Sequence, residues 1–181
     1  MHRIIGNEEF DNEGQTLTLE FPQCYIVNVY VPKSGEHSIK DCGEMKNLNN
    51  FLCYLDYKKK VFLSADLNVA HMEIDLTQPR LNVGMAALTI DERDDLTNLL
   101  MSGFVDAFRY LFPRDKRYTF WQFGKGHRKK NIGWRLDYLL VSERWKDKIL
   151  NVEIHDQVGA SDHCPVTLAM SFDSSLEAVK E

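Results

Sequence analysis

The chain has 181 residues, of which 44% are hydrophobic and 27% charged, and its formal net charge at pH 7 is −5. These values are ordinary for a soluble globular protein, and the length suffices for one compact domain with a hydrophobic core. The net negative charge argues against indiscriminate binding to nucleic acids, but it allows a local basic surface. No apolar run is long enough to cross a membrane, and the first residues lack a signal-peptide layout, so no membrane partner is expected.

The four cysteines indicate an intracellular protein. They are Cys24, Cys42, Cys53 and Cys164, and no two of them form a Cys-x-x-Cys pair. This spacing is unlike that of a zinc site or a disulfide framework, so we expect reduced, mostly buried thiols.

The first part of the chain predicts the order strand, strand, helix, strand. Alternation over residues 16–20 predicts a half-buried strand, and the β-branched and aromatic run 25–31 predicts a central strand that Pro32 ends. Residues 41–58 place apolar side chains at the spacing of one helix face. The apolar run that begins at Val61 predicts a buried strand.

A polar loop over residues 69–88 leads into the second part of the chain. Thr89 and Glu92 have the spacing of a capping box, so a helix should begin there, and Gly103 should end it. The later segments predict a short helical piece at 104–112 and strands at 118–121, 133–141, 149–155 and 166–172. Residues 173–181 are expected to form a frayed polar tail. No repeat, linker or second domain is visible.

The buried strand from Val61 ends in a carboxylate, Asp66, and Asn68 follows two residues later. On an extended backbone, residues i and i+2 point the same way, so both side chains can face one site at the end of the strand. An Asp can take a proton or hold a cation, and an Asn can orient a water or a phosphate. The alternative is a simple turn, because Asp and Asn commonly begin loops.

Two further polar groups stand out near the end of the chain. Asp137 lies inside an apolar strand, where a carboxylate needs a donor such as Arg or His. Arg135 could provide a structural ion pair, or Asp137 could orient His163 as a carboxylate orients a catalytic imidazole. Asp162 and His163 could supply a metal ligand and an acid or base, although such pairs also occur in ordinary loops.

Together these stretches resemble the exonuclease III-type family of apurinic/apyrimidinic endonucleases, within the endonuclease/exonuclease/phosphatase superfamily. The resemblance runs from Gly6 to about Met170 and corresponds to the C-terminal portion of the family's domain. The motifs that carry it are Tyr30-Val31-Pro32, Asp66-Leu67-Asn68-Val69-Ala70-His71 with Glu73-Ile74-Asp75-Leu76, Tyr118-Thr119-Phe120-Trp121, the string from Asn131 to Ser142, and Ser161-Asp162-His163-Cys164-Pro165.

The resemblance implies an α/β fold that is part of a four-layered sandwich, with mixed, largely antiparallel sheets flanked by helices. The family's domain begins with a half that carries an Asn near the first strand and a Gln-Glu pair whose Glu is the principal metal carboxylate. Nothing in this sequence corresponds to that half. We therefore expect residues 1–172 to form an incomplete domain.

The activity implied by the resemblance is Mg²⁺-dependent hydrolysis of a DNA phosphodiester on the 5′ side of an abasic site, with Mn²⁺ as an alternative metal. The resemblance also implies possible exonuclease, 3′-phosphodiesterase and lyase activities. The partner would be double-stranded DNA with an abasic site. The location would be intracellular, and nuclear in a eukaryote.

The family's catalytic roles carry over residue by residue. Asp66 would activate or align the attacking water, with Asn68 beside it. His163, held by Asp137, would donate a hydrogen bond to the phosphate, and Tyr30 would contact the same phosphate.

Two further sets of residues carry over. The implied metal ligands are Asp66, Asn68, Asp162 and His163. The implied DNA contacts are Asn82, Phe120, Arg128, Lys130, Trp134 and Leu136. Of these, Phe120, Trp134 and Leu136 would form the apolar pocket for the extruded sugar, and Asn82 would hold a phosphate oxygen.

The sequence departs from the family in its DNA-contact loops. Lys33 and Glu36 stand where the family more often has Asn and a basic residue, Met85 stands where a second Asn is common, and Ala107 replaces a usual Ser or Thr. Glu36 would face a polyanion, so binding to the DNA backbone should be weaker there.

A basic cluster with interleaved aromatic residues suits contact with DNA. Its members are Arg114, Lys116, Arg117, Lys125, Arg128, Lys129, Lys130 and Arg135, against the single acid Asp115. The alternative is a solvated loop beside a core strand.

Two function classes stay open. The chain is either an abasic-site repair enzyme, presented as a fragment or completed by the missing half, or a non-catalytic remnant that binds DNA or protein. Because an unpaired sheet would expose an apolar face, self-association is expected in the absence of that half.

Overall fold

We analysed a computed structural model, which describes residues 14–33, 41–79, 88–124 and 126–172. Its strands are β1 (Thr16–Glu20), β2 (Cys24–Tyr30), β3 (Lys60–Asp66), β4 (Phe104–Asp106), β5 (Asp137–Ser142), β6 (Ile149–Ile154) and β7 (Val166–Met170). Its α-helices are α2 (Asp41–Lys58), α3 (Ile90–Met101) and α4 (Ala107–Leu111), and its 3₁₀ helices are η1 (Glu73–Asp75) and η3 (Glu143–Lys148). Within the described ranges, no helix is both long and apolar enough to span a bilayer.

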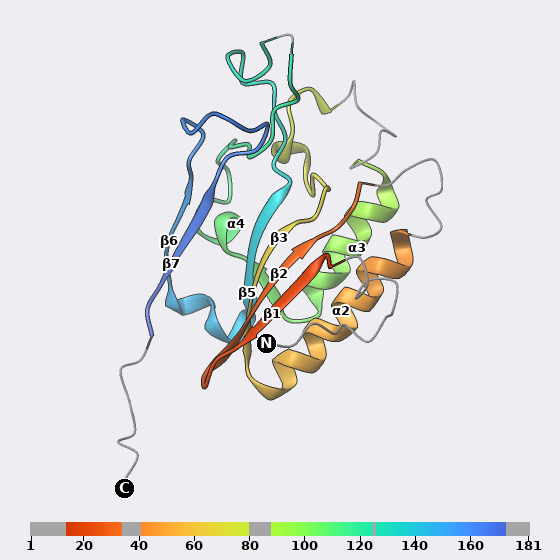
Figure 1. The fold of residues 1–181 in the computed structure, drawn as a ribbon, viewed down its shortest axis with the longest axis vertical. Helices are drawn as coiled ribbons and strands as arrows, with labels where there is room; N and C mark the ends of the chain where they lie inside the picture. Colours follow the sequence, from red (N-terminus) through yellow and green to blue (C-terminus); the bar gives the residue numbers. More distant parts are fainter. Residues whose placement is uncertain (1–13, 34–40, 80–87, 125, 173–181) are drawn as a thin grey trace, which may run out of the picture.

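The strands form two sheets, as the expected α/β architecture requires. Five strands pair in the order β1-β2-β3-β5-β4, and β6 pairs with β7. Only the β2–β3 pairing is parallel, so the larger sheet is mixed and largely antiparallel. Helices α2 and α3 cover one face of this sheet, and the β6–β7 pair lies on its other side (Figure 1).

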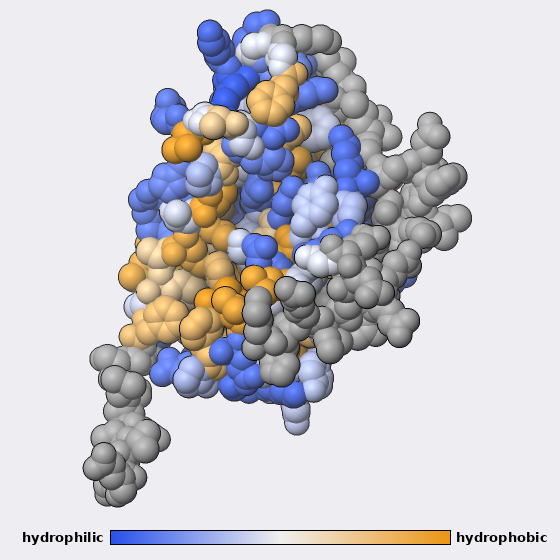
Figure 2. All heavy atoms as spheres, in the orientation of Figure 1, coloured by the Kyte–Doolittle hydropathy of each residue, from blue (hydrophilic) through white to orange (hydrophobic). Residues whose placement is uncertain are grey.

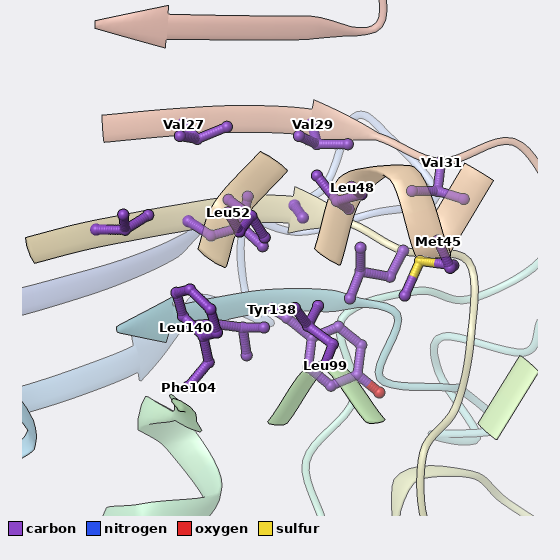
Figure 3. Packing of buried hydrophobic residues seen from close by; sticks show 14 of the residues in the cluster. Val27, Val29, Val31, Met45, Leu48, Leu52, Leu99, Phe104, Tyr138 and Leu140 are labelled. Atoms are coloured by element: carbon purple, nitrogen blue, oxygen red, sulfur yellow. The ribbon is translucent and has the colours of Figure 1, made fainter. Parts of the chain in front are cut away.

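The main core lies between the larger sheet and the two long helices. Val27 and Val29 of β2 point toward Leu48 and Leu52 of α2, and Leu99 of α3 packs beside them (Figure 3). All five side chains are almost fully buried. Each such side chain contributes about 1.5–3 kcal/mol to folding, so this layer fixes the sheet that carries the candidate site.

The opposite face of the larger sheet is only partly covered. Ile26 of β2 and Phe62 of β3 are half-buried neighbours in one cross-strand row, and Asn28 and Tyr30 of β2 are exposed. Hydrophobic side chains gather over β6, β7 and the adjoining part of the sheet (Figure 2). An apolar sheet face of this kind normally packs against another layer.

Most of the predicted elements are confirmed, including the strands near 16–20, 25–31 and 61–66 and the helix over 41–58. The capping box is also present, since the backbone N–H of Glu92 donates to Oγ1 of Thr89 at 3.3 Å.

Three predicted boundaries are wrong. Residues 104–112 begin as strand β4, because Asp106 caps a separate short helix through the backbone N–H of Arg109 at 3.1 Å. The segment 133–141 becomes a strand only at Asp137. Residues 118–121 form isolated bridges instead of a strand, because their backbone groups pair with two different segments, around residues 134 and 162–164.

A buried network of charges ties the loop after β3 to the segment that precedes β5. Nε of Arg135 lies 2.8 Å from Oδ1 of Asp75, and NH1 of Arg135 lies 2.7 Å from Oδ2 of Asp106. Arg109 also pairs with Asp75, at 2.5 Å. Arg135 is 1% exposed, so its expected membership of a DNA-facing basic cluster is wrong. Burial favours the neutral acid, but the charge of Arg135 and its hydrogen bond lower the pKa of Asp75 below its usual value.

Replacing Arg135→Met should strongly destabilise the fold, because Asp106 would lose its guanidinium partner and Asp75 would keep only Arg109. We expect a loss of about 3–5 kcal/mol in the free energy of unfolding, measured by urea denaturation at pH 7. Lys146→Met, which breaks an exposed ion pair with Glu143, is the matched control and should change stability by less than about 1 kcal/mol. An equal effect of both variants would contradict a structural role for the network.

Candidate active site at the end of the β2–β3–β5 sheet

Asp66 and Asn68 lie at the carboxyl end of β3, beside the end of β2. The register of the parallel pair places Asp66 opposite Tyr30. The backbone N–H of Asn68 donates to Oδ1 of Asp66 at 3.0 Å, and Nδ2 of Asn68 donates to the carbonyl of Val31 at 2.9 Å. Because the amide nitrogen is used in this way, Oδ1 of Asn68 is the atom that can face a ligand.

The backbone at Asn68 differs from the extended conformation assumed in the prediction. Its φ is +50°, in the left-handed region that Asn tolerates better than most residues. The two alternatives for Asp66 and Asn68, a turn and a polar site, therefore hold together. The turn at Asn68 brings its side-chain amide to the carbonyl of Val31 at the end of β2.

Asp137 orients His163, as one of the two predictions for this carboxylate proposed. Nδ1 of His163 lies 2.9 Å from Oδ2 of Asp137, and the alternative pairing with Arg135 is wrong because that side chain binds Asp75 and Asp106. With Nδ1 donating to the carboxylate, Nε2 is directed toward Asp66, whose Oδ2 lies 3.9 Å away.

These side chains converge from neighbouring strands and one loop. Asp66 and Asp137 face each other in the antiparallel β3–β5 register, and His163 comes from the loop before β7. Ligand atoms of the three lie within 4.8 Å of one another. A groove of about 310 Å³, lined by Tyr30, Ser64 and both carboxylates, opens beside them.

The site concentrates negative charge in a half-buried place. Burial first, and the nearby charge of Asp137 second, raise the pKa of Asp66 to about 6. The hydrogen bond that His163 donates to Asp137 raises the pKa of His163 above its usual value, and the charges of Asp137 and Asp66 add to this effect. Both shifts show that the site favours a bound proton or cation.

Divalent metal ions fit this donor set. Asp66 and His163 can offer a carboxylate oxygen and Nε2, and Oδ1 of Asn68 is close in sequence. Asp162 is half-buried in the same loop as His163, and its charge acts on the pKa values of both Asp66 and His163. These residues include the predicted metal ligands, and the excess of carboxylate charge is what a cation would relieve.

A second hollow lies next to the candidate site and contains two of the expected pocket residues. Phe120 and Trp134 line it, with ring centroids 6.3 Å apart, and the Phe120 ring is 4.9 Å from that of His163. Its volume is about 360 Å³, and Lys33 lies at its edge, 5.4 Å from the Trp134 ring. Leu136 is not part of the wall, because it is buried in a small cluster against which these two rings pack.

The expected DNA contacts occupy different environments. Lys130 is exposed, whereas the guanidinium of Arg128 donates to three backbone carbonyls. Asn82, Glu36 and Met85 fall outside the described residues, as does Lys125 of the basic cluster.

Thr119 supports the site and was missed by the sequence reasoning. Its Oγ1 accepts from the backbone N–H groups of Leu136 and Asp137, at 3.0 and 3.1 Å. This contact fixes the start of β5, and hence the carboxylate that holds His163. The only signal in the sequence was the position of Thr119 within the Tyr118–Trp121 motif.

Replacing Asp137→Asn should lower the pKa of His163, because the hydrogen-bonded carboxylate is the largest cause of its rise. An NMR titration of the imidazole resonances checks this. His71 is the internal control, because burial lowers its pKa and its titration should be the same in both proteins. An unchanged His163 titration would show that Asp137 does not control the imidazole.

Replacing Asp66→Asn should stabilise the metal-free protein at pH 7. Because the pKa of Asp66 in the folded protein is raised to about 6, above its ordinary value, stability falls as the pH rises from about 4 through 6. Removing the charge should add on the order of 1 kcal/mol at pH 7 and nothing at pH 4, as measured by urea unfolding with a chelator. Equal stabilities of Asp66→Asn and the parent chain at pH 7 would show that the Asp66 carboxylate carries no such penalty.

Known proteins share both the sequence and the fold. The chain is 42% identical to an exodeoxyribonuclease of Bacillus subtilis, over 93% of this chain and 68% of that protein. It is 41% identical to a DNA-(apurinic or apyrimidinic site) endonuclease of Dictyostelium discoideum, over 93% of this chain and 49% of that protein. It thus spans about half to two thirds of the length of these relatives.

A solved structure has the same fold. An AP endonuclease from Archaeoglobus fulgidus superposes with a TM-score of 0.83 at 24% identity, covering 92% of this chain and 68% of that one. A family model also matches residues 31–163, which contain the whole constellation described above. The chain therefore belongs to the Endonuclease/Exonuclease/phosphatase family, as its motifs predicted.

Proposed function

We propose that this chain carries the hydrolytic site of a DNA repair nuclease that cleaves the phosphodiester on the 5′ side of an abasic site. The observation that carries the proposal is the Asp66–His163–Asp137 arrangement at the end of the sheet. The names of the relatives, an exodeoxyribonuclease and an abasic-site endonuclease, agree with this chemistry. Exonuclease and 3′-phosphodiesterase reactions would use the same groups.

The side chains divide the work of phosphodiester hydrolysis. Asp66, whose pKa is raised to about 6, is largely ionised at neutral pH and still basic enough to align or deprotonate a water. The raised pKa of His163 favours the protonated imidazole, in which Nδ1 donates to Asp137 and Nε2 can donate a hydrogen bond to a phosphate oxygen. Tyr30 lies beside Asp66 with 48% of its surface exposed, so it can reach the same phosphate.

The proposed metal is Mg²⁺, with Mn²⁺ as the alternative, held by Asp66, Asn68, Asp162 and His163. When bound, such an ion neutralises phosphate charge and eases departure of the leaving oxygen. The carboxylate and amide oxygens of this set are the atoms that Mg²⁺ prefers, and the imidazole can complete it only in its neutral form, when Nε2 does not donate to the phosphate.

The hollow lined by Phe120 and Trp134 suits the sugar of an abasic site. Phe120 and Trp134 offer apolar walls for a sugar without its base, and the contact of the Phe120 ring with the His163 ring would place the sugar next to the hydrolytic groups. Lys33, Lys129 and Lys130 provide exposed positive charge for the DNA backbone. Asn82 is proposed as a further phosphate contact.

Because the proposed substrate is genomic DNA, we propose an intracellular location, and the nucleus in a eukaryotic cell.

The partly covered face of the larger sheet leads us to propose a partner for this chain. Ile26, Asn28 and Phe62 lie on that face, and the groove beside Asp66 opens from it. We propose that the segment corresponding to the first part of the relatives covers this face and adds a metal carboxylate. Self-association would cover the same face when that segment is absent.

The uncovered face also favours a second candidate function. A family member whose site remains incomplete could still bind DNA or protein through this surface. This non-catalytic role predicts binding to abasic DNA that neither Mg²⁺ nor the added segment converts into cleavage.

The nicking of an abasic-site duplex with Mg²⁺ distinguishes the two. We expect little cleavage by the 181-residue chain alone, and strong cleavage when the N-terminal segment of the Bacillus subtilis relative is added as a separate polypeptide. Asp66→Asn should lower the complemented rate by roughly 10²–10⁴-fold while leaving DNA binding intact. His163→Ala should act similarly, and Lys146→Met is the control.

Two outcomes would overturn the proposal in different ways. Robust nicking by the monomeric chain alone, abolished by His163→Ala, would show that no partner segment is needed. Complemented activity that survives Asp66→Asn within a few-fold would remove this carboxylate from the mechanism.

A further inference from the structure

Arg128 makes contacts that its position in a basic loop does not predict. NH1 donates to the carbonyl of Ser161 at 2.8 Å, and NH2 donates to the carbonyls of Asp156 and Val158 at 3.1 and 2.5 Å. All three acceptors belong to one loop, residues 155–165, which connects β6 to β7 and carries Asp162 and His163. Three of the five guanidinium N–H donors are thus directed at the loop backbone.

The guanidinium rests on a rigid platform. Its central carbon lies 4.5 Å from the ring centroid of Trp121, a stacking contact that favours Arg. The ring is almost fully buried, and its Nε1 donates to Asn131 at 3.2 Å. At Gly133 a Cβ would meet the ring at 2.6 Å, so only glycine permits this close packing. The platform cannot shift without disturbing the segment that leads into β5.

The loop needs an external support. Between β6 and β7 it contains no helix or strand, and Ala160 has a φ of +133°, a conformation that L-residues rarely adopt. Trp121 supports its far end, because its backbone N–H donates to the carbonyl of Asp162 at 2.7 Å. A planar guanidinium can hold three carbonyls at fixed angles, whereas an ammonium group offers a single point of charge.

We propose that Arg128 is a positioning residue that clamps this loop onto Trp121 and thereby sets the places of Asp162 and His163. This replaces its predicted role as a DNA phosphate contact. The roles of Asp162 and His163 in catalysis rest on the proposed function. The contacts by which Arg128 holds the loop do not depend on it.

The test compares Arg128→Gln and Arg128→Lys with the exposed neighbour Lys129→Gln in the metal-free chain. Hydrogen exchange of residues 156–163 should accelerate at least tenfold in both Arg128 variants and remain at the parent rate in Lys129→Gln. Exchange of β2 should be the same in all four proteins, which separates loop positioning from global stability. The His163 imidazole resonance should shift or broaden only in the Arg128 variants, without DNA.

A second measurement addresses the competing role. Binding to a duplex with a tetrahydrofuran abasic analogue should keep the salt dependence of the parent chain in Arg128→Gln, whereas Lys129→Gln, which removes a charge proposed to face the DNA backbone, should reduce it. A phosphate contact instead predicts weaker binding and a salt slope smaller by about one, with unchanged loop exchange. That pattern, or parent-like exchange in Arg128→Lys, would overturn the clamp. None of these readouts requires cleavage, so failure of the nuclease proposal leaves the result interpretable.

Discussion

The structure depends on the buried pairing of Arg135 with Asp75. Asp75 lies in the loop that follows Asp66 along the chain, and Arg135 lies two residues before Asp137, so one ion pair joins the two segments that meet at the candidate site. The backbone N–H of Arg135 also donates to the carbonyl of Asp75 at 2.7 Å. A buried pair tolerates little change in geometry, because any separation leaves a charge without a partner. The positions of the two site carboxylates are therefore coupled.

The segment 134–137 joins the site to its support. Trp134 faces the hollow, Arg135 turns into the charge network, and Asp137 meets His163. Each residue serves a different neighbour, yet consecutive residues cannot move independently. Thr119 holds the same segment from the other side, through the backbone of Leu136 and Asp137. A substitution at the hollow lined by Phe120 and Trp134 would therefore also affect the orientation of the imidazole.

The sequence predicted the parts of the fold that depend on local pattern. The capping box at Thr89 and the buried strand ending at Asp66 depend on periodicity and capping, and both are confirmed. Residues 118–121 have a strand-like composition, but their hydrogen bonds go to two distant segments, which no local pattern records. Arg128 and Arg135 both belong to the predicted basic cluster, and the predicted alternative for Arg135 is an ion pair with Asp137. Their partners are backbone carbonyls and buried carboxylates brought near by the fold, so charge type alone could not reveal what each arginine binds.

The candidate site brings like charges together at an electrostatic cost, and this cost indicates which kind of group the site would bind. Two carboxylates face each other across β3 and β5, and burial prevents water from screening them fully. The fold accepts this arrangement because the helix-facing side of the same strands is tightly packed. The pKa shifts of Asp66 and His163 show that a positive charge between them would be stabilised before any substrate arrives. A cation bound there would be attracted to a phosphate by its charge, and the surrounding carboxylates would limit how tightly product phosphate is retained.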